Sequence, residues 1–434
     1  MYNTRKKFLF FITTYLFCVL AVAQNDINSP YSRFGIGNLS PRTNSVLASM
    51  GGVGYALQNP YYINFKNPAA FAAFDSLSFI ADLSVDVVNQ QLKMQKLEHK
   101  DAFAQLGYLA VGVCFTKIWH TSAGIMPFSD VGYAIVDTTK KLVVPETGDT
   151  YAITNRYTGT GGLQLLYWGN AFKVYKGLSL GINLGYLFGT INTSRFAEYN
   201  VSNALNTLFS NSRTVNGIYF SGGIQYQVTI QEKHHLGFGA VYENGIKVWS
   251  KENLLILNYM GTYSPNHNFD TVIRPAEKEK LKTIKMPHIV GGGFSYGYKD
   301  RVLASADVTW QNWKSFEMPN NLYDSLKNNI IAALGVQYVP NPMSSKYFNK
   351  INFRLGTRFA SGYMAINNTP ISEFAVSMGF GFPLRTISYR SSVNIMFEYS
   401  RLGTIQNDLI LQNNFKLSFN FILQERWYQR RKLD

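Results

Sequence analysis

The chain has few cysteines, few charged residues and no long uncharged apolar run beyond its first two dozen residues. Its two cysteines are Cys18 and Cys114. We expect Cys18 to be removed with an export signal, so an intramolecular disulfide and a Cys-x-x-Cys metal or redox site are excluded. A helix needs about 18 or more consecutive apolar residues to cross a bilayer, and the mature chain offers no such run.

Motifs of catalytic and metal sites are also missing. The six histidines form no His-Glu-x-x-His motif, and His234-His235 falls in a predicted turn where adjacent side chains diverge. Gly291-Gly292-Gly293 lies in a strand-like segment with no helix after it, which argues against a phosphate loop and favours close approach of a neighbour or a bend in the strand. A Ser-His-Asn triad built from separate strands would leave no local motif, but nothing in the sequence points to one. Because the motifs of catalytic and metal sites are missing, we predict no enzyme, no metal site and no cofactor.

Aromatic residues and glycine are abundant instead. Phe, Tyr and Trp make up 15% of the chain, charged residues 15%, and 35 glycines are spread along it. A protein whose apolar surface faces lipid has this composition. The formal net charge is +15. Because export separates the chain from nucleic acid, lipid phosphates or envelope proteins are the expected partners of this charge.

The N-terminus carries the pattern of an export signal. Arg5, Lys6 and Lys7 precede an uncharged stretch, residues 8–22, that ends at Ala21-Val22-Ala23. This predicts a signal peptide over residues 1–23, cleaved near Ala23, with a retained anchor helix as the alternative.

The rest of the chain alternates polar and apolar residues many times. In residues 76–88, Asp82 and Asp86 fall on one face and Leu83, Val85 and Val87 on the other. The same period of two recurs at residues 178–188, 302–311, 351–359 and 415–421. A β-sandwich also alternates, but its strands average about 5–6 residues, whereas membrane strands need about 9–11. Most segments here run that long, which favours a membrane barrel.

The connections support a barrel with both ends in the periplasm. Short links are expected at residues 117–118, 171–176, 231–234, 299–300, 340–349 and 383–390. Longer links are expected at residues 89–104, 137–151, 191–212, within 251–270, 314–325, 362–371 and 403–410. Short periplasmic turns alternate with longer extracellular loops in outer-membrane barrels. Taking residues 236–262 as one strand predicts an all-β, fourteen-stranded antiparallel transmembrane β-barrel over residues 76–424.

Charged residues predicted to face the lumen argue against an apolar tunnel throughout. These residues are Asp82, Asp86, Asp307, Arg354, Arg358 and Lys416.

Residues 24–75 do not alternate and are predicted to form an N-terminal hatch that plugs the lumen. Irregular backbone is viable at membrane depth where protein surrounds it. The alternative is a periplasmic leader, but the segment is apolar, with Phe34, Ile36, Leu39, Val46, Leu47, Met50 and Val53. The expected hatch positions are Gly51, Gly52, Asn67, Pro68 and Ala69. Pro68 would fix φ where the chain turns toward the first strand.

Several stretches resemble a known family. Ser32-Arg33-Phe34-Gly35, the Met50–Gly54 glycine run, Asn67-Pro68-Ala69-Ala70 and the Trp310–Ser315 run are similar to the FadL-like long-chain fatty-acid transporters of the outer membrane. The sequences near the two ends, SPYSRFGIGNL at residues 29–39 and RWYQRRKLD at residues 426–434, resemble the Bacteroidetes branch of this family. The resemblance implies a fourteen-stranded barrel with a hatch in the outer membrane of a Gram-negative bacterium. It also implies lateral passage of hydrophobic compounds into the bilayer.

The resemblance and the residues together suggest a gate and a capture site. Gly124 and Pro127 lie inside the third predicted strand, where relatives have a kink that opens the wall; the alternative places Pro127 at the extracellular rim. Expected capture residues are Leu205, Leu208 and Phe209, at helical spacing, with Leu254, Leu255 and Ile256 on the next extracellular connection. The alternative is that these two segments pack against each other.

Two functions follow from these observations. The first is an outer-membrane transporter-like barrel for long-chain fatty acids or similar hydrophobic compounds. The alternative is a non-transporting accessory barrel of a multi-protein envelope complex for secretion or outer-membrane assembly. A basic tail at residues 425–434, unusual after the last strand of such barrels, favours the alternative as a periplasmic contact for a partner or lipid head groups.

Overall fold

The computed structural model describes residues 28–76, 78–139, 141–143, 150–201, 204–261, 263, 270–273, 281–318, 326–366, 368–384 and 391–426. The predicted signal peptide and residues 427–434 of the predicted tail lie outside these ranges.

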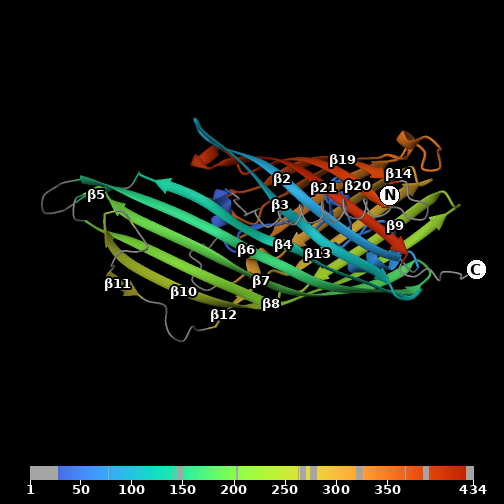
Figure 1. Cartoon of the computed structure of the whole chain (residues 1–434), viewed down its shortest axis with the longest axis horizontal. Coiled ribbons are helices and arrows are strands. Elements are labelled where there is room, and N and C mark those ends of the chain that lie inside the picture. The colour runs from blue at the N-terminus through green and yellow to red at the C-terminus, as the bar shows by residue number, and fades with distance from the viewer. Residues whose placement is uncertain are drawn as a thin grey trace, which may run out of the picture.

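The described strands close into a fourteen-stranded antiparallel barrel, as predicted (Figure 1). One half of the wall consists of β2 (Ser78–Met94), β3 (Leu97–Cys114), β4 (Trp119–Asp137), β6 (Thr150–Tyr175), β7 (Leu178–Tyr199) and β8 (Leu205–Ile230). The other half ends with β14 (Val302–Gln311), β15 (Asn329–Tyr338), β16 (Asn352–Ala360), β19 (Glu373–Pro383), β20 (Ser392–Leu402) and β21 (Leu411–Arg426). Pairing of β2 with β21, from Ser78↔Arg426 to Lys93↔Leu411, closes the circle.

Two wall strands between these halves are interrupted. β9 (His234–Glu243) continues as β10 (Lys247–Met260), and β12 (Lys282–Lys285) continues as β13 (Ile289–Tyr298). β9 and β10 both pair with β8, so they count as one strand of the wall. The single strand predicted over residues 236–262 is thus present but broken.

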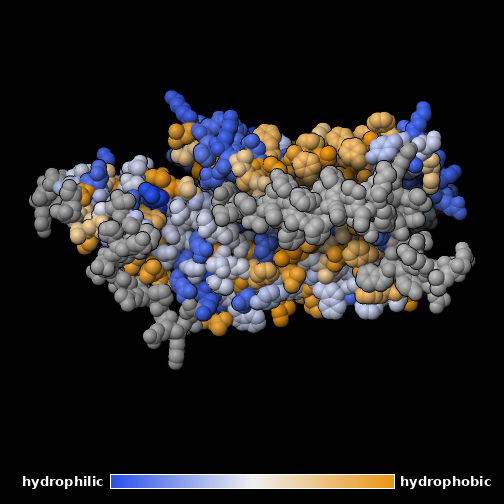
Figure 2. Space-filling view, in the orientation of Figure 1, coloured by the Kyte–Doolittle hydropathy of each residue, from blue (hydrophilic) through white to orange (hydrophobic). Residues whose placement is uncertain are grey.

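The wall alternates between a lumen face and a lipid face. On β2 the buried residues Ser78, Ile80, Asp82, Ser84 and Asp86 point inward and alternate with more exposed neighbours. The predicted lumen charges are confirmed: Asp82, Asp86, Asp307, Arg354 and Arg358 are buried, and Lys416 contacts Asp86 at 2.6 Å. Figure 2 shows apolar side chains gathered along the middle of the wall and hydrophilic ones toward both ends. This is the distribution that lipid outside and polar groups inside impose.

The barrel is much taller on one side. β6 and β8 have 26 residues each, whereas β13, β14 and β15 have 10 each. The end where β2 starts and β21 stops carries the short turns, for example at residues 176–177 and 231–233, and we assign it to the periplasm. The tall side therefore projects from the extracellular face, where the short strands β5 (Lys141–Val143) and β11 (Asp270–Ile273) extend it.

Two long links expected from the sequence are wrong. Residues 89–104 are strand on both sides of a tight turn at Gln95–Lys96, and residues 191–212 are strand except near residue 200. The helical spacing read there is also strand: Leu208 pairs with Leu257 and Phe209 with Ile256. Polar cross-strand contacts, such as Arg213 to Glu252 at 2.8 Å, continue the ladder above the membrane, where the bilayer no longer limits strand length.

The hatch lies inside the barrel. It contains η1 (Pro30–Arg33), β1 (Asn38–Leu39), α2 (Ser45–Ala48) and η2 (Pro68–Ala73). Hydrogen bonds tie it to the wall around the circumference: Ser29 to Gly132 on β4, Ser45 to Ser84 on β2, and Gly51 to Ser377 on β19. Its apolar residues, Ile36, Val46, Leu47, Met50 and Val53 among them, form the main buried core with the inner wall.

Small elements complete the described part. They are η3 (Trp313–Ser315), η4 (Tyr347–Lys350), η5 (Gln406–Asp408) and the pair β17 (Ala365–Ile366) and β18 (Thr369–Pro370). Among the residues described, no helix is long and apolar enough to cross a membrane.

Candidate functional site: the hatch–wall contact and the cavity above it

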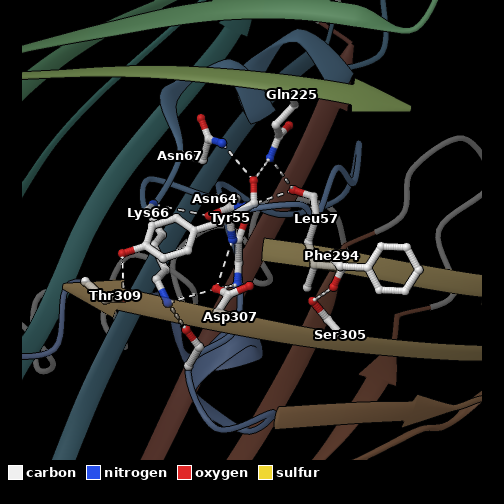
Figure 3. Close-up of polar contacts among 12 residues, drawn as sticks. Tyr55, Leu57, Asn64, Lys66, Asn67, Gln225, Phe294, Ser305, Asp307 and Thr309 are labelled. Carbon is white, nitrogen blue, oxygen red and sulfur yellow. Dashed lines mark hydrogen bonds and ion pairs between the residues drawn. The ribbon is translucent and has the colours of Figure 1, made fainter. Parts of the chain in front are cut away.

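The hatch is held to β14 by one buried carboxylate, Asp307 (Figure 3). Its Oδ2 accepts hydrogen bonds from the backbone N–H groups of Gly54 (2.7 Å) and Tyr55 (3.1 Å) and from Lys66 Nζ (3.0 Å). Lys66 also donates to the carbonyl of Gly52 at 2.5 Å and lies 4.2 Å from the centre of the Tyr55 ring. One charged pair therefore organises the irregular chain between Gly52 and Lys66.

The carbonyl groups of the same segment are satisfied by amide side chains. Tyr55 O accepts from Asn67 Nδ2 and from Gln225 Nε2 on β8, both at 2.7 Å. Asn64 Nδ2 donates to Gly54 O (2.7 Å) and Leu57 O (2.8 Å). Buried irregular backbone is stable when its polar groups are paired in this way.

A second ion pair joins the hatch to the end of β9. Arg42 contacts Glu243 Oε2 at 2.7 Å and donates to the Tyr219 hydroxyl at 2.7 Å. Burial disfavours the charge on Arg42, but the Glu243 carboxylate outweighs it, so the net pKa of Arg42 is raised. Burial likewise raises the pKa of Tyr55. Arg42 is therefore a fixed cation, and Tyr55 is neutral, with its hydroxyl 2.9 Å from Thr309 Oγ1 on β14.

Glycines of the wall let the hatch approach closely. A Cβ on Gly291 would lie 2.2 Å from the Tyr55 ring, and one on Gly239 would lie 1.8 Å from the Tyr55 carbonyl oxygen. The expectation that Gly291–Gly293 admits a neighbour is thus confirmed. Equivalent contacts occur at Gly181 and Gly223 beside Asn67 and Pro68, and at Gly335 and Gly356 beside Met50.

The predicted hatch residues lie in this interface. Gly51 has φ +73°, and its N–H donates to Ser377 Oγ at 2.9 Å. Gly52 (φ +82°) supplies the carbonyl that Lys66 binds. Asn67 caps η2 by accepting from Ala69 N at 3.0 Å, and Pro68 takes the first position of that helix.

A cavity of about 380 Å³ lies on the extracellular side of the hatch. Arg42, Tyr55 and Lys66 of the hatch line it, together with inward residues from most of the wall. Its charged lining is largely paired, for example Arg358 with Glu373 (2.9 Å) and Glu398 (3.3 Å). Its apolar lining includes Met126, Phe128, Leu187, Ile246, Met286 and Trp313. The size is in the lower part of the range for ligand pockets, roughly 300–1,000 Å³.

The predicted gate residues lie where β3 and β4 separate. These strands pair from Cys114↔His120 to Leu109↔Ile125. Beyond that point β4 pairs with hatch strand β1, through Leu39↔Ser129 and Asn38↔Asp130, and its pairing with β6 has a bulge after Pro127. Glycine is required at position 124 for packing, because a Cβ there would lie 2.7 Å from the carbonyl oxygen of Leu109 on β3. The gate itself stays a prediction.

The predicted capture residues do not line this cavity as it is described. Leu208 packs in a separate cluster with Leu257 and Tyr259, with Leu255 at its edge. Leu205 and Phe209 are exposed on β8, and Leu254 and Ile256 lie on β10 beside it. The two segments therefore contact each other, and ligand capture stays a prediction.

Sequence reasoning missed the partners that fix the hatch. Asp307 was expected in the lumen, but nothing local to the sequence paired it with Lys66, or Glu243 with Arg42. The sequence shows cations in the hatch and inward carboxylates on the wall, but not which of them meet, because that depends on how the folded hatch is placed against the wall. Among the described residues, no cluster of histidine, cysteine and carboxylate side chains could hold a metal ion.

Comparisons with known proteins agree on the architecture. A family model described as BamG matches residues 5–434. A Pseudomonas aeruginosa FadL homologue has a similar structure, with a TM-score of 0.58 and 14% identity, over 90% of this chain and 100% of that one. The Pseudomonas putida toluene transporter TodX is similar too, with a TM-score of 0.57 and 15% identity, over 91% of this chain and 100% of that one.

The channel CymD, described as a monoaromatic hydrocarbon channel, gives a TM-score of 0.55 at 14% identity, over 91% of this chain and 99% of that one. No curated protein matches the sequence. At these identities the structures establish the fold alone, and they confirm the predicted resemblance to FadL-type outer-membrane barrels.

Proposed function

The chain belongs to the BamG family, and from this we propose that it is an accessory barrel of a multi-protein complex that assembles outer-membrane proteins. The fold places it in the outer membrane. The family name points to the β-barrel assembly machinery, BAM, as the complex. The family match spans nearly the whole chain and is the observation that carries the proposal.

The anchoring of the hatch supports a non-transporting role. A transporter of this shape needs its hatch to move, but two ion pairs and close contacts with wall glycines hold this one. Separating a buried ion pair so that one charge is left without its partner costs about 3–5 kcal/mol of stability. Moving the hatch would expose several such groups together.

The tall side of the wall supports a docking role. β6, β7 and β8 have 26, 22 and 26 residues, well beyond the roughly 9–11 that a membrane strand needs. This surplus forms a paired extracellular sheet beside the barrel mouth (Figure 1). We propose it, together with the basic tail, as contact surface for neighbouring subunits on the two sides of the membrane.

Transport of hydrophobic compounds is the second candidate. The 380 Å³ cavity and the separation of β3 from β4 favour it. Solved channels and transporters with this fold carry names that refer to toluene and monoaromatic hydrocarbons. In this reading a fatty acid or similar molecule would bind in the cavity and leave beside Pro127.

Affinity purification from native membranes in mild detergent separates the two functions. We expect the tagged full-length chain to co-purify with other envelope proteins in stoichiometric amounts, identified by mass spectrometry. A tagged FadL-type transporter expressed in the same cells is the matched control. Recovery of the chain alone or with lipid, as for the control, would contradict the accessory role.

A further inference from the structure

Regular strand pairing stops at one level on two neighbouring strands. β9 pairs with β13 as far as Glu243↔Ile289, and β10 pairs with β12 from Lys247↔Lys285 onward. Residues 244–246 and 286–288 lie between these registers, and we call them the wall break. A backbone hydrogen bond from Met286 N to Ile246 O (2.8 Å) crosses it. The wall is thus weaker here than in the regular ladders on either side.

The inner side of the wall break opens on the cavity. Asn244, Ile246, Met286 and Pro287 all line it, and Met286 and Pro287 are buried. Three of these side chains are apolar. An alkyl chain passing the wall here would therefore meet apolar contacts directly.

A single imidazole fills the break. A Cβ on Gly245 would lie 2.6 Å from the Met286 carbonyl oxygen and 2.7 Å from Cδ2 of His288, so glycine admits both the facing backbone and the ring. His288 Nδ1 accepts from Gly245 N at 3.2 Å and lies 2.9 Å from the Tyr242 hydroxyl.

The break lies at the outer edge of the apolar band. On the lipid face of β8 the residues change from Thr214 and Asn216 to Ile218, which is 60% exposed. Trp249 is opposite Asn216 and is exposed on the same face. Because tryptophan marks the level of lipid head groups, the break opens where a lipid changes from head group to acyl chain.

Two lysines stand directly opposite each other just above the break. Their neighbours Val248 and Ile284 are fully buried and paired, so Lys247 and Lys285 face outward together. Like charges directly opposite each other destabilise a sheet unless an anion lies between them. Lys285 contacts Glu317 at 2.9 Å, but that carboxylate is 74% exposed, and exposed pairs contribute little. A phosphate oxygen would accept from both ammonium groups.

We propose that the wall break is a binding site for an anionic lipid of the outer leaflet. The lipid phosphate lies between Lys247 and Lys285, and its acyl chain passes His288 between Ile246 and Met286 into the cavity. The strands β4, β6, β7 and β8 lie between this site and the β3–β4 separation. It is also tied to the hatch, because Glu243 at the end of β9 holds Arg42.

Photo-crosslinking in nanodiscs tests the proposal. The full mature chain is reconstituted with phosphatidylglycerol that carries a diazirine near the end of its acyl chain, and separately with the matching phosphatidylcholine. We expect phosphatidylglycerol to label peptides containing Ile246 or Met286 at least fivefold more than phosphatidylcholine does. The Lys247→Glu/Lys285→Glu variant should abolish this preference. Lys93→Glu/Lys100→Glu, an equal charge change on the exposed β2–β3 hairpin, should keep it.

A filling variant tests the route of the acyl chain. With His288→Trp, which puts a larger ring in the break, labelling of cavity residues should fall while the preference for the anionic lipid remains. Equal labelling by the two lipids in the unmodified chain, or labelling spread evenly around the apolar band, would overturn the proposal without relying on any variant. Labelling centred on Met126 and Phe128 would place the lipid at the β3–β4 separation instead and would also overturn it.

Discussion

Asp307 and Glu243, two carboxylates of the wall, each hold one cation of the hatch. Asp307 also accepts two backbone N–H groups, so its charge is bound by three donors while its side chain is 1% exposed. A buried charge that loses its partner keeps its desolvation cost, which makes a single substitution more harmful than the removal of both partners. The Asp307 cluster is therefore where the position of the hatch is most sensitive to one residue.

We predict that Asp307→Asn loosens the hatch. The substitution leaves Lys66, whose side chain is 15% exposed, without its anion, at a cost of up to about 3–5 kcal/mol. Amide exchange of residues 50–58, followed by mass spectrometry, should accelerate at least tenfold. Asp300→Asn, the same change in a turn where the side chain is 79% exposed, should leave that exchange unaltered. Unchanged exchange in Asp307→Asn would show that the ion pair does not fix the hatch.

Gly51→Ala should destabilise the protein through both backbone and packing. A left-handed residue with a Cβ costs about 1–2 kcal/mol, and that Cβ would lie 2.5 Å from Thr357 O on β16. Thermal unfolding in detergent should shift to lower temperature. Gly222→Ala is the control, because a Cβ there has no neighbour within 4 Å. Equal transitions for the two variants would mean that the hatch does not press against β16 at Gly51.

At the scale of elements, the pairing of β1 with β4 decides whether the hatch is a plug or a gate. Where β3 leaves β4, the hatch supplies the pairing through Asn38↔Asp130 and Leu39↔Ser129. The backbone groups of β4 that β3 leaves are partly satisfied in this way, so the wall stays closed as long as β1 stays in place.

A disulfide between β1 and β4 should separate the two functions. In a Cys114→Ala background, Asn38→Cys and Asp130→Cys face each other in an antiparallel register, where Cβ atoms are about 4.5–5.5 Å apart. We expect oxidation to link them in high yield and to leave co-purification with partners unchanged. The reduced variant is the control. If fatty-acid uptake occurs in the reduced form and stops on oxidation, β1 is a moving gate and the accessory role is wrong.

The sequence predicted most of the wall and little of its interior contacts. Alternation fixes which face of a strand is polar, so the inward positions of Asp82, Asp86, Asp307, Arg354 and Arg358 followed directly. The ends of the strands could not be predicted from the sequence. Above the membrane the strands continue through polar residues, and a polar stretch is equally typical of a loop. Residues 191–212 were misread because the spacing of Leu205, Leu208 and Phe209 is that of a helix face. In β8 these residues fall on opposite faces, with Leu208 buried and Leu205 and Phe209 exposed.

For the hatch as well, the position could be predicted from the sequence but the contacts could not. Its place in the lumen followed from apolar residues such as Leu47 and Met50 in a segment without strand pattern. The pairs Lys66–Asp307 and Arg42–Glu243 did not follow, because they join residues about two hundred or more positions apart and depend on how the hatch is rotated within the wall. Glycines at alternate strand positions, such as Gly291 and Gly293, were the one sequence signal of close approach.

At the scale of the whole molecule, the shape is an outer-membrane barrel with a filled lumen and one tall side. The hatch in the lumen accounts for the polar, paired residues inside, and the tall side offers a large surface to neighbours. A transporter needs the hatch in the lumen to move, whereas an accessory subunit needs a surface such as the tall side for its partners. The family assignment and the anchoring of the hatch both favour the accessory subunit.

The abundance of folded outer-membrane proteins after depletion of this chain tests the account most directly. Folded barrels are counted by their resistance to unfolding in cold detergent on gels, relative to total outer-membrane protein. We predict that depletion lowers the folded fraction of several unrelated barrels and that the oxidised Asn38→Cys/Asp130→Cys chain restores it. An unchanged folded fraction, together with a loss of fatty-acid uptake, would contradict the account and identify a transporter.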